Sequence, residues 1–127
     1  MMAVYPINGK TWLICGGRDF SDNDLFSRAM SDIMASFGCP RRVVQGGARG
    51  ADAMGSAFAK RMAIEQIEVR ADWEKHGKAA GAIRNQQMLD DYHPDAVIAF
   101  PGGRGTADMI KRARARMIDV IEIRVTA

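Results

Sequence analysis

The feature of this chain that most constrains its fold is a repeated alternation of short apolar runs with segments of helical periodicity. The helical segments, in which apolar side chains recur every three or four residues, are 25–37, 54–62, 79–92 and 109–117. The apolar runs that we interpret as strands are 12–15, 43–44, 67–70, 96–100 and 120–123. Strands that alternate with helices are typical of βαβ units and predict an α/β fold with a parallel sheet.

The distribution of charge among the strands predicts their order. Runs 12–15 and 96–100 are apolar on both faces, as central parallel strands are. Runs 67–70 and 120–123 contain charged residues, which favours the sheet edges. We therefore expect a Rossmann-like, doubly wound three-layer sandwich with a five-stranded, mainly parallel sheet in the order 3-2-1-4-5. A length of 127 residues predicts one domain over 1–127.

Composition excludes several classes of protein. No apolar run reaches the roughly 18 residues that a membrane-spanning helix needs, and Met1–Lys10 lacks the pattern of a signal peptide, so we expect a cytoplasmic protein. The two cysteines, Cys15 and Cys39, form no CxxC pair, and no Cys/His cluster has metal-ligand spacing, so we predict no metal site. A net charge of +3 is mild and makes nucleic acid an unfavoured partner.

Glycines and basic residues gather directly after the predicted strands. In a parallel sheet these positions share one edge, and each loop there leads into a helix start with free N–H groups and the positive end of the helix dipole. Such helix starts bind anions, and glycine lets the backbone approach a ligand closely. The predicted ligand-binding residues are Gly16, Gly17, Arg18, Gly46, Gly47, Arg49, Gly50, Asp52, Arg84, Asn85, Pro101, Gly102, Gly103, Arg104, Gly105 and Thr106.

The arginines distinguish a binding edge from a set of ordinary tight turns. A glycine-rich turn needs no arginine, and arginines gathered at one edge repel each other unless an anion or acidic side chains lie between them. The arginines in question are Arg18, Arg49, Arg84 and Arg104, and the acidic candidates are Asp19, Asp52 and Asp72. We therefore predict a phosphate-binding crevice between the first and fourth strands, where the crossovers reverse direction.

Several side chains at this edge have two interpretations. Asp52 either satisfies free N–H groups at its helix start or binds a ribose hydroxyl, and we favour the ribose. Thr106 either caps a helix or donates its hydroxyl to a phosphate. Trp73 either stacks on a base or shields the sheet edge. The candidate catalytic residues are Asp52, His76 and Asp108, although a surface histidine without a chemical role is the simpler interpretation of His76.

Five motifs at this edge carry a family resemblance. They are Gly46–Asp52, Ala71–Trp73, His76–Gly81, Arg84–Met88 and Pro101–Met109. Together they resemble the YspA, cpYpsA-related branch of the SLOG superfamily, over a stretch from Trp12 to Ile123. The resemblance implies a Rossmann-like domain that binds a nucleotide-like ligand. Because superfamily relatives often pair through helices, it is also compatible with a homo-oligomer.

The resemblance implies three functions. The first is binding or sensing of an ADP-ribose-like or NAD-like ligand. The second is N-glycosidic hydrolysis by a phosphoribohydrolase of LOG type, but LOG enzymes place a catalytic glutamate where this chain has Met109, and Asp108 lies about 100° around the helix from that position. The third is single-strand nucleic-acid binding of Smf type. We expect no cofactor beyond the nucleotide-like ligand and leave open whether a reaction is catalysed.

Overall fold

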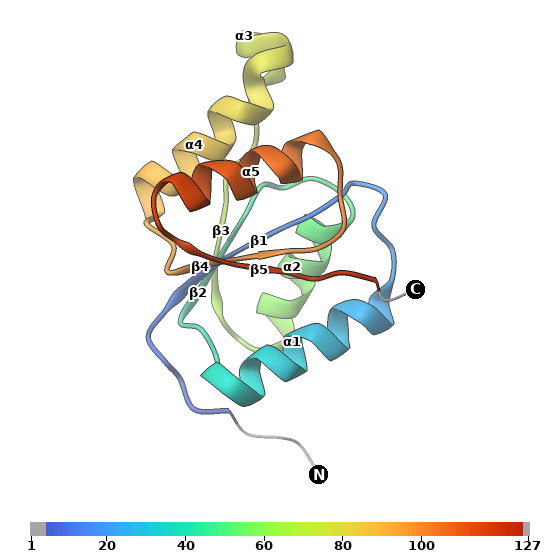
Figure 1. The fold of residues 1–127 in the computed structure, drawn as a ribbon, viewed down its shortest axis with the longest axis vertical. Coiled ribbons are helices and arrows are strands. Elements are labelled where there is room, and N and C mark those ends of the chain that lie inside the picture. The colour runs from blue at the N-terminus through green and yellow to red at the C-terminus, as the bar shows by residue number, and fades with distance from the viewer. Residues whose placement is uncertain (1–4, 126–127) are drawn as a thin grey trace.

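The structure, a computed structural model, describes residues 5–125 (Figure 1). Its strands are β1 (Thr11–Cys15), β2 (Arg42–Gln45), β3 (Glu65–Glu68), β4 (Ala96–Ala99) and β5 (Asp119–Glu122). Its helices are α1 (Asn23–Phe37), α2 (Ala51–Arg61), α3 (Trp73–His76), α4 (Ala80–Tyr92) and α5 (Arg104–Ala115), with a 3₁₀ turn η1 (Gly77–Ala79). No helix in this part of the chain is long and apolar enough to cross a membrane. The first four residues of Met1–Lys10 lie outside the described range.

The five strands form one sheet in which every neighbouring pair is parallel. The order is β3-β2-β1-β4-β5, so the predicted order 3-2-1-4-5 is confirmed. β1 lies at the centre, where Leu13 pairs with Val44 on one side and with Val97 on the other. All five residues of β1 are buried, as its apolar composition predicts.

Helices cover both faces of the sheet and complete the predicted three layers. Successive side chains of a strand point to opposite faces, so Ile14 packs with Phe26 of α1 on one side. Leu13 packs with Met88 of α4 and Met109 of α5 on the other side. α4 and α5 lie side by side on one face of the sheet, and α1 and α2 lie on the other (Figure 1).

All five strands differ by one or two residues at their ends from the sequence-based prediction, most of all β3. β3 is Glu65–Glu68 rather than 67–70, because the four residues of β2 pair from Arg42 opposite Glu65 to Gln45 opposite Glu68. β4 ends at Ala99 rather than at residue 100, immediately before Phe100 and the turn at Pro101.

The segment before α4 is helical, which the sequence did not reveal. Asp72 caps α3 by accepting the Lys75 N–H at 3.0 Å, and η1 then continues into α4. α3 therefore extends from the N-terminal end of α4, away from the sheet (Figure 1). This extension places Trp73 beside the carboxyl edge of the sheet.

Candidate functional site

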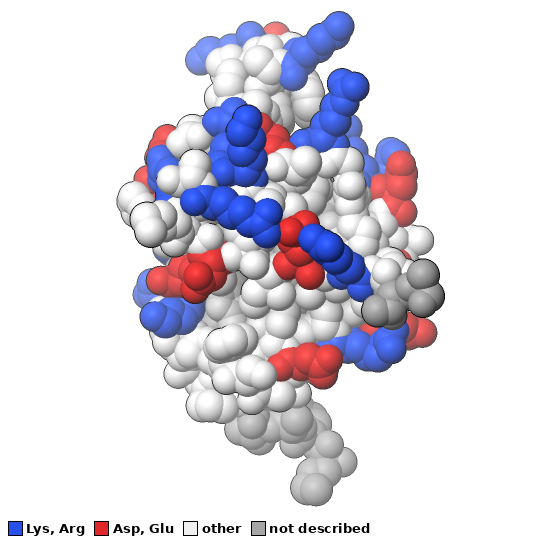
Figure 2. Space-filling model, viewed as in Figure 1, with Lys and Arg blue, Asp and Glu red and all other residues white. Residues whose placement is uncertain are grey.

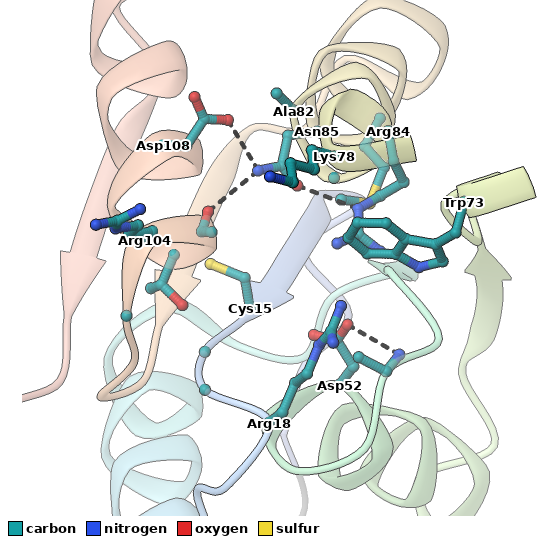
Figure 3. Close-up of a pocket in the computed structure, with 18 residues that line it drawn as sticks. Cys15, Arg18, Asp52, Trp73, Lys78, Ala82, Arg84, Asn85, Arg104 and Asp108 are labelled. Atoms are coloured by element: carbon teal, nitrogen blue, oxygen red, sulfur yellow. Dashed lines mark hydrogen bonds between the residues drawn. The ribbon is translucent and has the colours of Figure 1, made fainter. Parts of the chain in front are cut away.

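A pocket of about 620 Å³ opens at the carboxyl end of β1, between α4 and α5 (Figure 3). Its walls come from four segments: the loop after β1, the start of α2 with its preceding loop, the segment from α3 into α4, and the start of α5. A volume of this size is typical of small-molecule sites. The pocket therefore includes the predicted crevice between β1 and β4 and extends from it along α4.

Most of the predicted ligand-binding residues line this pocket. They are Gly16, Gly17, Arg18, Asp52, Arg84, Asn85, Gly103, Arg104, Gly105 and Thr106. Of the candidate catalytic residues, Asp52 and Asp108 line it and His76 does not. Segments far apart in the sequence thus converge on one space, as the parallel topology requires.

The remaining predicted residues belong to the same loops but do not line the pocket. They are Gly46, Gly47, Arg49, Gly50, Pro101 and Gly102. The Pro101 carbonyl accepts the Gly17 N–H at 2.9 Å, which joins the loops after β1 and β4. Arg49 forms an exposed ion pair with Asp19 at 2.9 Å. These contacts position the loops around the pocket.

The helices that follow β2 and β4 begin differently from α1 and α3. Asp22 and Asp72 cap α1 and α3 through their carboxylates, which accept backbone N–H groups. α2 and α5 begin after Gly50 and Gly103 with no side-chain cap. Thr106 is buried in the first turn of α5 and does not act as its N-cap. The first-turn N–H groups of α5 therefore remain available to a ligand.

Four cationic side chains line the pocket: Arg18, Lys78, Arg84 and Arg104. Arg84 is held rigidly, because its guanidinium donates to the Gly46 carbonyl at 2.7 Å and to Asn85 Oδ1 at 3.2 Å. Burial and the neighbouring Arg18 lower the pKa of Arg84, against the raising effect of Asp52. This balance of charge favours an anionic ligand.

Asn85 connects the two helices that flank the pocket. Its Nδ2 donates to the Gly105 carbonyl at 3.1 Å and to Asp108 Oδ2 at 3.0 Å (Figure 3). Asp108 Oδ2 also accepts from Arg112 at 2.8 Å. Burial raises the pKa of Asp108, but the hydrogen bonds from Arg112 and Asn85 outweigh this effect and hold it below its ordinary value. Asp108 is therefore ionised, and both of its hydrogen-bond partners belong to the protein.

Asp52 is the other carboxylate of the pocket and lies in a different environment. It is only 6% exposed, in the first turn of α2 as predicted, and its Oδ2 accepts the Ala48 N–H at 3.2 Å. Burial raises the pKa of Asp52, and the N–H groups of Ala48 and Gly46, together with Arg84 and Arg18, oppose that rise only in part. The ionised carboxylate therefore costs the free protein stability.

Replacement of Asp52 by Asn should stabilise the free protein at neutral pH. Because the folded state holds the Asp52 proton more tightly than the unfolded state does, stability falls as pH rises from the ordinary pKa of 3.8 through the raised value. The melting temperature of Asp52→Asn should exceed that of the wild type at pH 7.5, and the difference should close near pH 4. Asp19→Asn, at an exposed ion pair, should change little. A lower melting temperature for Asp52→Asn at pH 7.5 would contradict this.

Cys15 lies between these groups at the end of β1. Burial, with Asp52 as a second cause, raises the pKa of the Cys15 thiol to about 12. The thiol therefore stays protonated at neutral pH and is a poor nucleophile. Cys15 forms part of the pocket floor.

Trp73 and Arg18 meet at the side of the pocket opposite Arg104 (Figure 3). The Arg18 guanidinium lies 5.2 Å from the centre of the Trp73 ring, within cation–π range. The Trp73 side chain remains half exposed. It therefore presents aromatic surface to the pocket rather than packing on the sheet edge.

Sequence reasoning missed part of the α4 wall. The missed lining residues include Lys78, Gly81, Ala82 and Met88. Gly81, Ala82 and Met88 lie three or four residues from Asn85, so they share one side of α4 with it, and Lys78 lies in η1 just before this helix. The helical spacing from Asn85 could therefore have predicted that the α4 residues line the pocket.

Basic side chains gather in the upper part of the face shown in Figure 2, over α3, α4 and α5. On α5 and at its C-cap residue, Arg116, these arginines are largely paired. Arg112 contacts Asp108, Arg114 contacts Glu122, and Arg116 contacts Asp90. Among the described residues, no cluster of His, Cys, Asp or Glu side chains could hold a metal ion.

The fold and this edge define a Rossmann-like α/β protein with a cation-lined pocket at the carboxyl ends of its strands. Residues 13–76 match the model of the YspA, cpYpsA-related SLOG family. The chain is also 39% identical over 116 residues to the Gene 61 protein of Mycobacterium phage D29, an alignment that covers 86% of this chain and 92% of the phage protein. The chain belongs to the YspA, cpYpsA-related SLOG family. No solved structure gives a significant match.

Proposed function

We propose that the pocket binds a phosphate-bearing nucleotide derivative of the ADP-ribose or NAD type, and that the protein serves as a binder or sensor of this ligand. The observation that carries the proposal is the uncapped start of α5, which opens into a pocket lined by four cations. A helix start of this kind supplies free N–H groups and a positive dipole end to an anion. Membership of the SLOG family supports a nucleotide-related ligand.

The phosphate fits best at the first turn of α5. A Cβ added at Gly103 or at Gly105 would meet no other atom within 4 Å, so the backbone there is open to a ligand. Arg104 lies between them and can add a charge-assisted hydrogen bond.

The base fits best against Trp73. Its half-exposed ring lies across the pocket from Arg104 (Figure 3), and aromatic rings stack well on nucleobases. Arg18, already against this ring, can stay on its face or turn toward a phosphate.

Binding is better supported than the LOG-type hydrolysis. The position of the LOG glutamate is occupied by Met109, which is 1% exposed in the core. Asp108 is committed to Arg112 and Asn85. The other carboxylate of the pocket, Asp52, lies in the first turn of α2 and not at the position of the LOG glutamate. A bounded pocket and ion-paired α5 arginines also favour a small ligand over a nucleic-acid strand.

A thermal-shift screen with AMP, ADP-ribose, NAD and pyrophosphate tests the proposal. A ligand at 100 times its dissociation constant should add about 2.7 kcal/mol to the free energy of unfolding. The absence of a shift with every one of these phosphates would refute the proposed function.

Arg104→Ala should weaken binding of the best ligand from this screen by roughly 10-fold or more, the value of a hydrogen bond to a charged group. The matched control is Arg49→Ala, because Arg49 lies in a neighbouring loop, pairs with Asp19 and does not line the pocket. Isothermal titration calorimetry measures both. Equal affinities for the two variants would show that the phosphate does not bind at α5.

A further inference from the structure

One oxygen of Asp52, Oδ1, has no side-chain partner among the residues that the structure describes. Oδ2 accepts the Ala48 N–H at 3.2 Å and lies nearest to Gly46, whose N–H also lowers the pKa of the carboxylate, whereas no side chain of the described residues donates a hydrogen bond to Oδ1. Among those residues, no buried side-chain nitrogen or oxygen lacks a partner. Oδ1 is therefore not sealed in the core, and the side chain, 6% exposed overall, presents it to the pocket that Asp52 lines.

Neither neighbouring arginine donates a hydrogen bond to this oxygen. The Arg84 guanidinium donates to Gly46 and Asn85, and the Arg18 guanidinium lies over Trp73. An ionised carboxylate only accepts hydrogen bonds. The group that meets Oδ1 must therefore be a donor, and a phosphate oxygen is excluded because both groups are negative.

The position of Asp52 selects which part of a nucleotide meets it. In Figure 3, Arg104 and Trp73 lie on opposite sides of the pocket, and Cys15 and Asp52 lie between them. In a nucleotide, the sugar lies between phosphate and base. With the phosphate at α5 and the base at Trp73, the sugar hydroxyls are the donors closest to Asp52.

We infer that Asp52 accepts a hydrogen bond from a ribose hydroxyl of the ligand, so that the site selects ribonucleotides over their deoxy counterparts. This inference rests on the proposed function, because it assumes the phosphate position at α5. Asp52 is then a specificity-determining residue, and the stability that its buried charge costs is compensated when a hydroxyl donates to it.

The inference is tested by titration calorimetry of the wild type with matched ligands. These are the four ribonucleoside 5′-monophosphates, their 2′-deoxy and 3′-deoxy forms, and the base-free pair ribose 5-phosphate and 2-deoxyribose 5-phosphate. Removal of the contacted hydroxyl should weaken binding by about 10-fold or more, because a buried charged acceptor then loses its donor.

Two variants assign this preference to Asp52. Asp52→Ala presents no acceptor and should bind ribo and deoxy forms equally. Asp52→Asn keeps the side-chain shape without the charge and should reduce the difference between the affinities for ribo and deoxy forms. Neither variant should bind pyrophosphate more weakly than the wild type, because pyrophosphate has no hydroxyl to donate. The comparison of ligands on the wild type remains decisive even if a variant fails to fold.

The outcomes separate this inference from the proposed function. If nucleotides bind but the wild type distinguishes neither the 2′-deoxy nor the 3′-deoxy form by more than about twofold, the role of Asp52 is refuted and the phosphate site stands. A preference that survives Asp52→Ala also refutes it. If no nucleotide, sugar phosphate or pyrophosphate binds, both proposals fail.

Discussion

Gly105→Leu should weaken ligand binding by about 100-fold while leaving the protein folded. Gly105 lies in the first turn of α5 and lines the pocket, and a side chain there meets no protein atom within 4 Å of its Cβ. Leucine also favours helix more than glycine does, by roughly 0.5–1 kcal/mol. The new side chain therefore occupies ligand space without straining the fold. We expect affinity for the best nucleotide to fall by about 100-fold, equivalent to about 2.7 kcal/mol.

The matched control for Gly105→Leu is Ala107→Leu. Ala107 is exposed on the same helix and lies outside the pocket. Calorimetry should give wild-type affinity for Ala107→Leu, and thermal melts should show both variants folded. Normal nucleotide binding by Gly105→Leu would place the ligand elsewhere.

Gly50→Ala should have the largest effect on stability. Gly50 has φ of +78° and ψ of −128°, a conformation that costs a residue with a Cβ on the order of 1–3 kcal/mol. The added Cβ would also press against the Gly17 carbonyl oxygen and lie 2.6 Å from that of Arg18. Neither backbone atom can move without disturbing the loop after β1. We expect the free energy of unfolding in urea to fall by about 3 kcal/mol or more.

Comparison with Gly77→Ala separates the two causes of the stability loss at Gly50, which are the backbone conformation and the contacts of the added Cβ. Gly77 also has a positive φ, +54°, but an added Cβ there meets nothing within 4 Å. The loss for Gly77→Ala should therefore be limited to the cost of the backbone conformation, on the order of 1–3 kcal/mol, and should be smaller than that for Gly50→Ala. Equal losses at the two glycines would show that the contact between Gly50 and the β1 loop is unimportant.

These glycines illustrate what could be predicted from the sequence. The strand order followed from the charged edges and apolar centre, because burial of a parallel strand acts directly on composition. The loops of the site followed from topology, because all strands end at one edge. The role of an individual glycine did not follow. Gly50 and Gly105 look alike in sequence, and only the three-dimensional neighbours of each show that one supports a loop and the other lines the pocket.

The other unpredicted features depend on contacts between distant segments. The helical conformation of Trp73–His76 has too few residues to produce a periodic pattern. The commitment of Asp108 depends on Asn85, which comes from another helix. The free oxygen of Asp52 depends on where the arginines direct their own hydrogen bonds. Sequence patterns report local preferences and burial, not partners of this kind.

Gly17 is the junction of the loops that surround the pocket. Its N–H donates to the Pro101 carbonyl at 2.9 Å, and its own carbonyl accepts the Ala51 N–H at 3.2 Å. Backbone hydrogen bonds thus join the turns after β1, β2 and β4 to one another. These loops are therefore held in place before any ligand binds, so binding would cost little conformational entropy of the chain. Even modest polar contacts can then yield useful affinity.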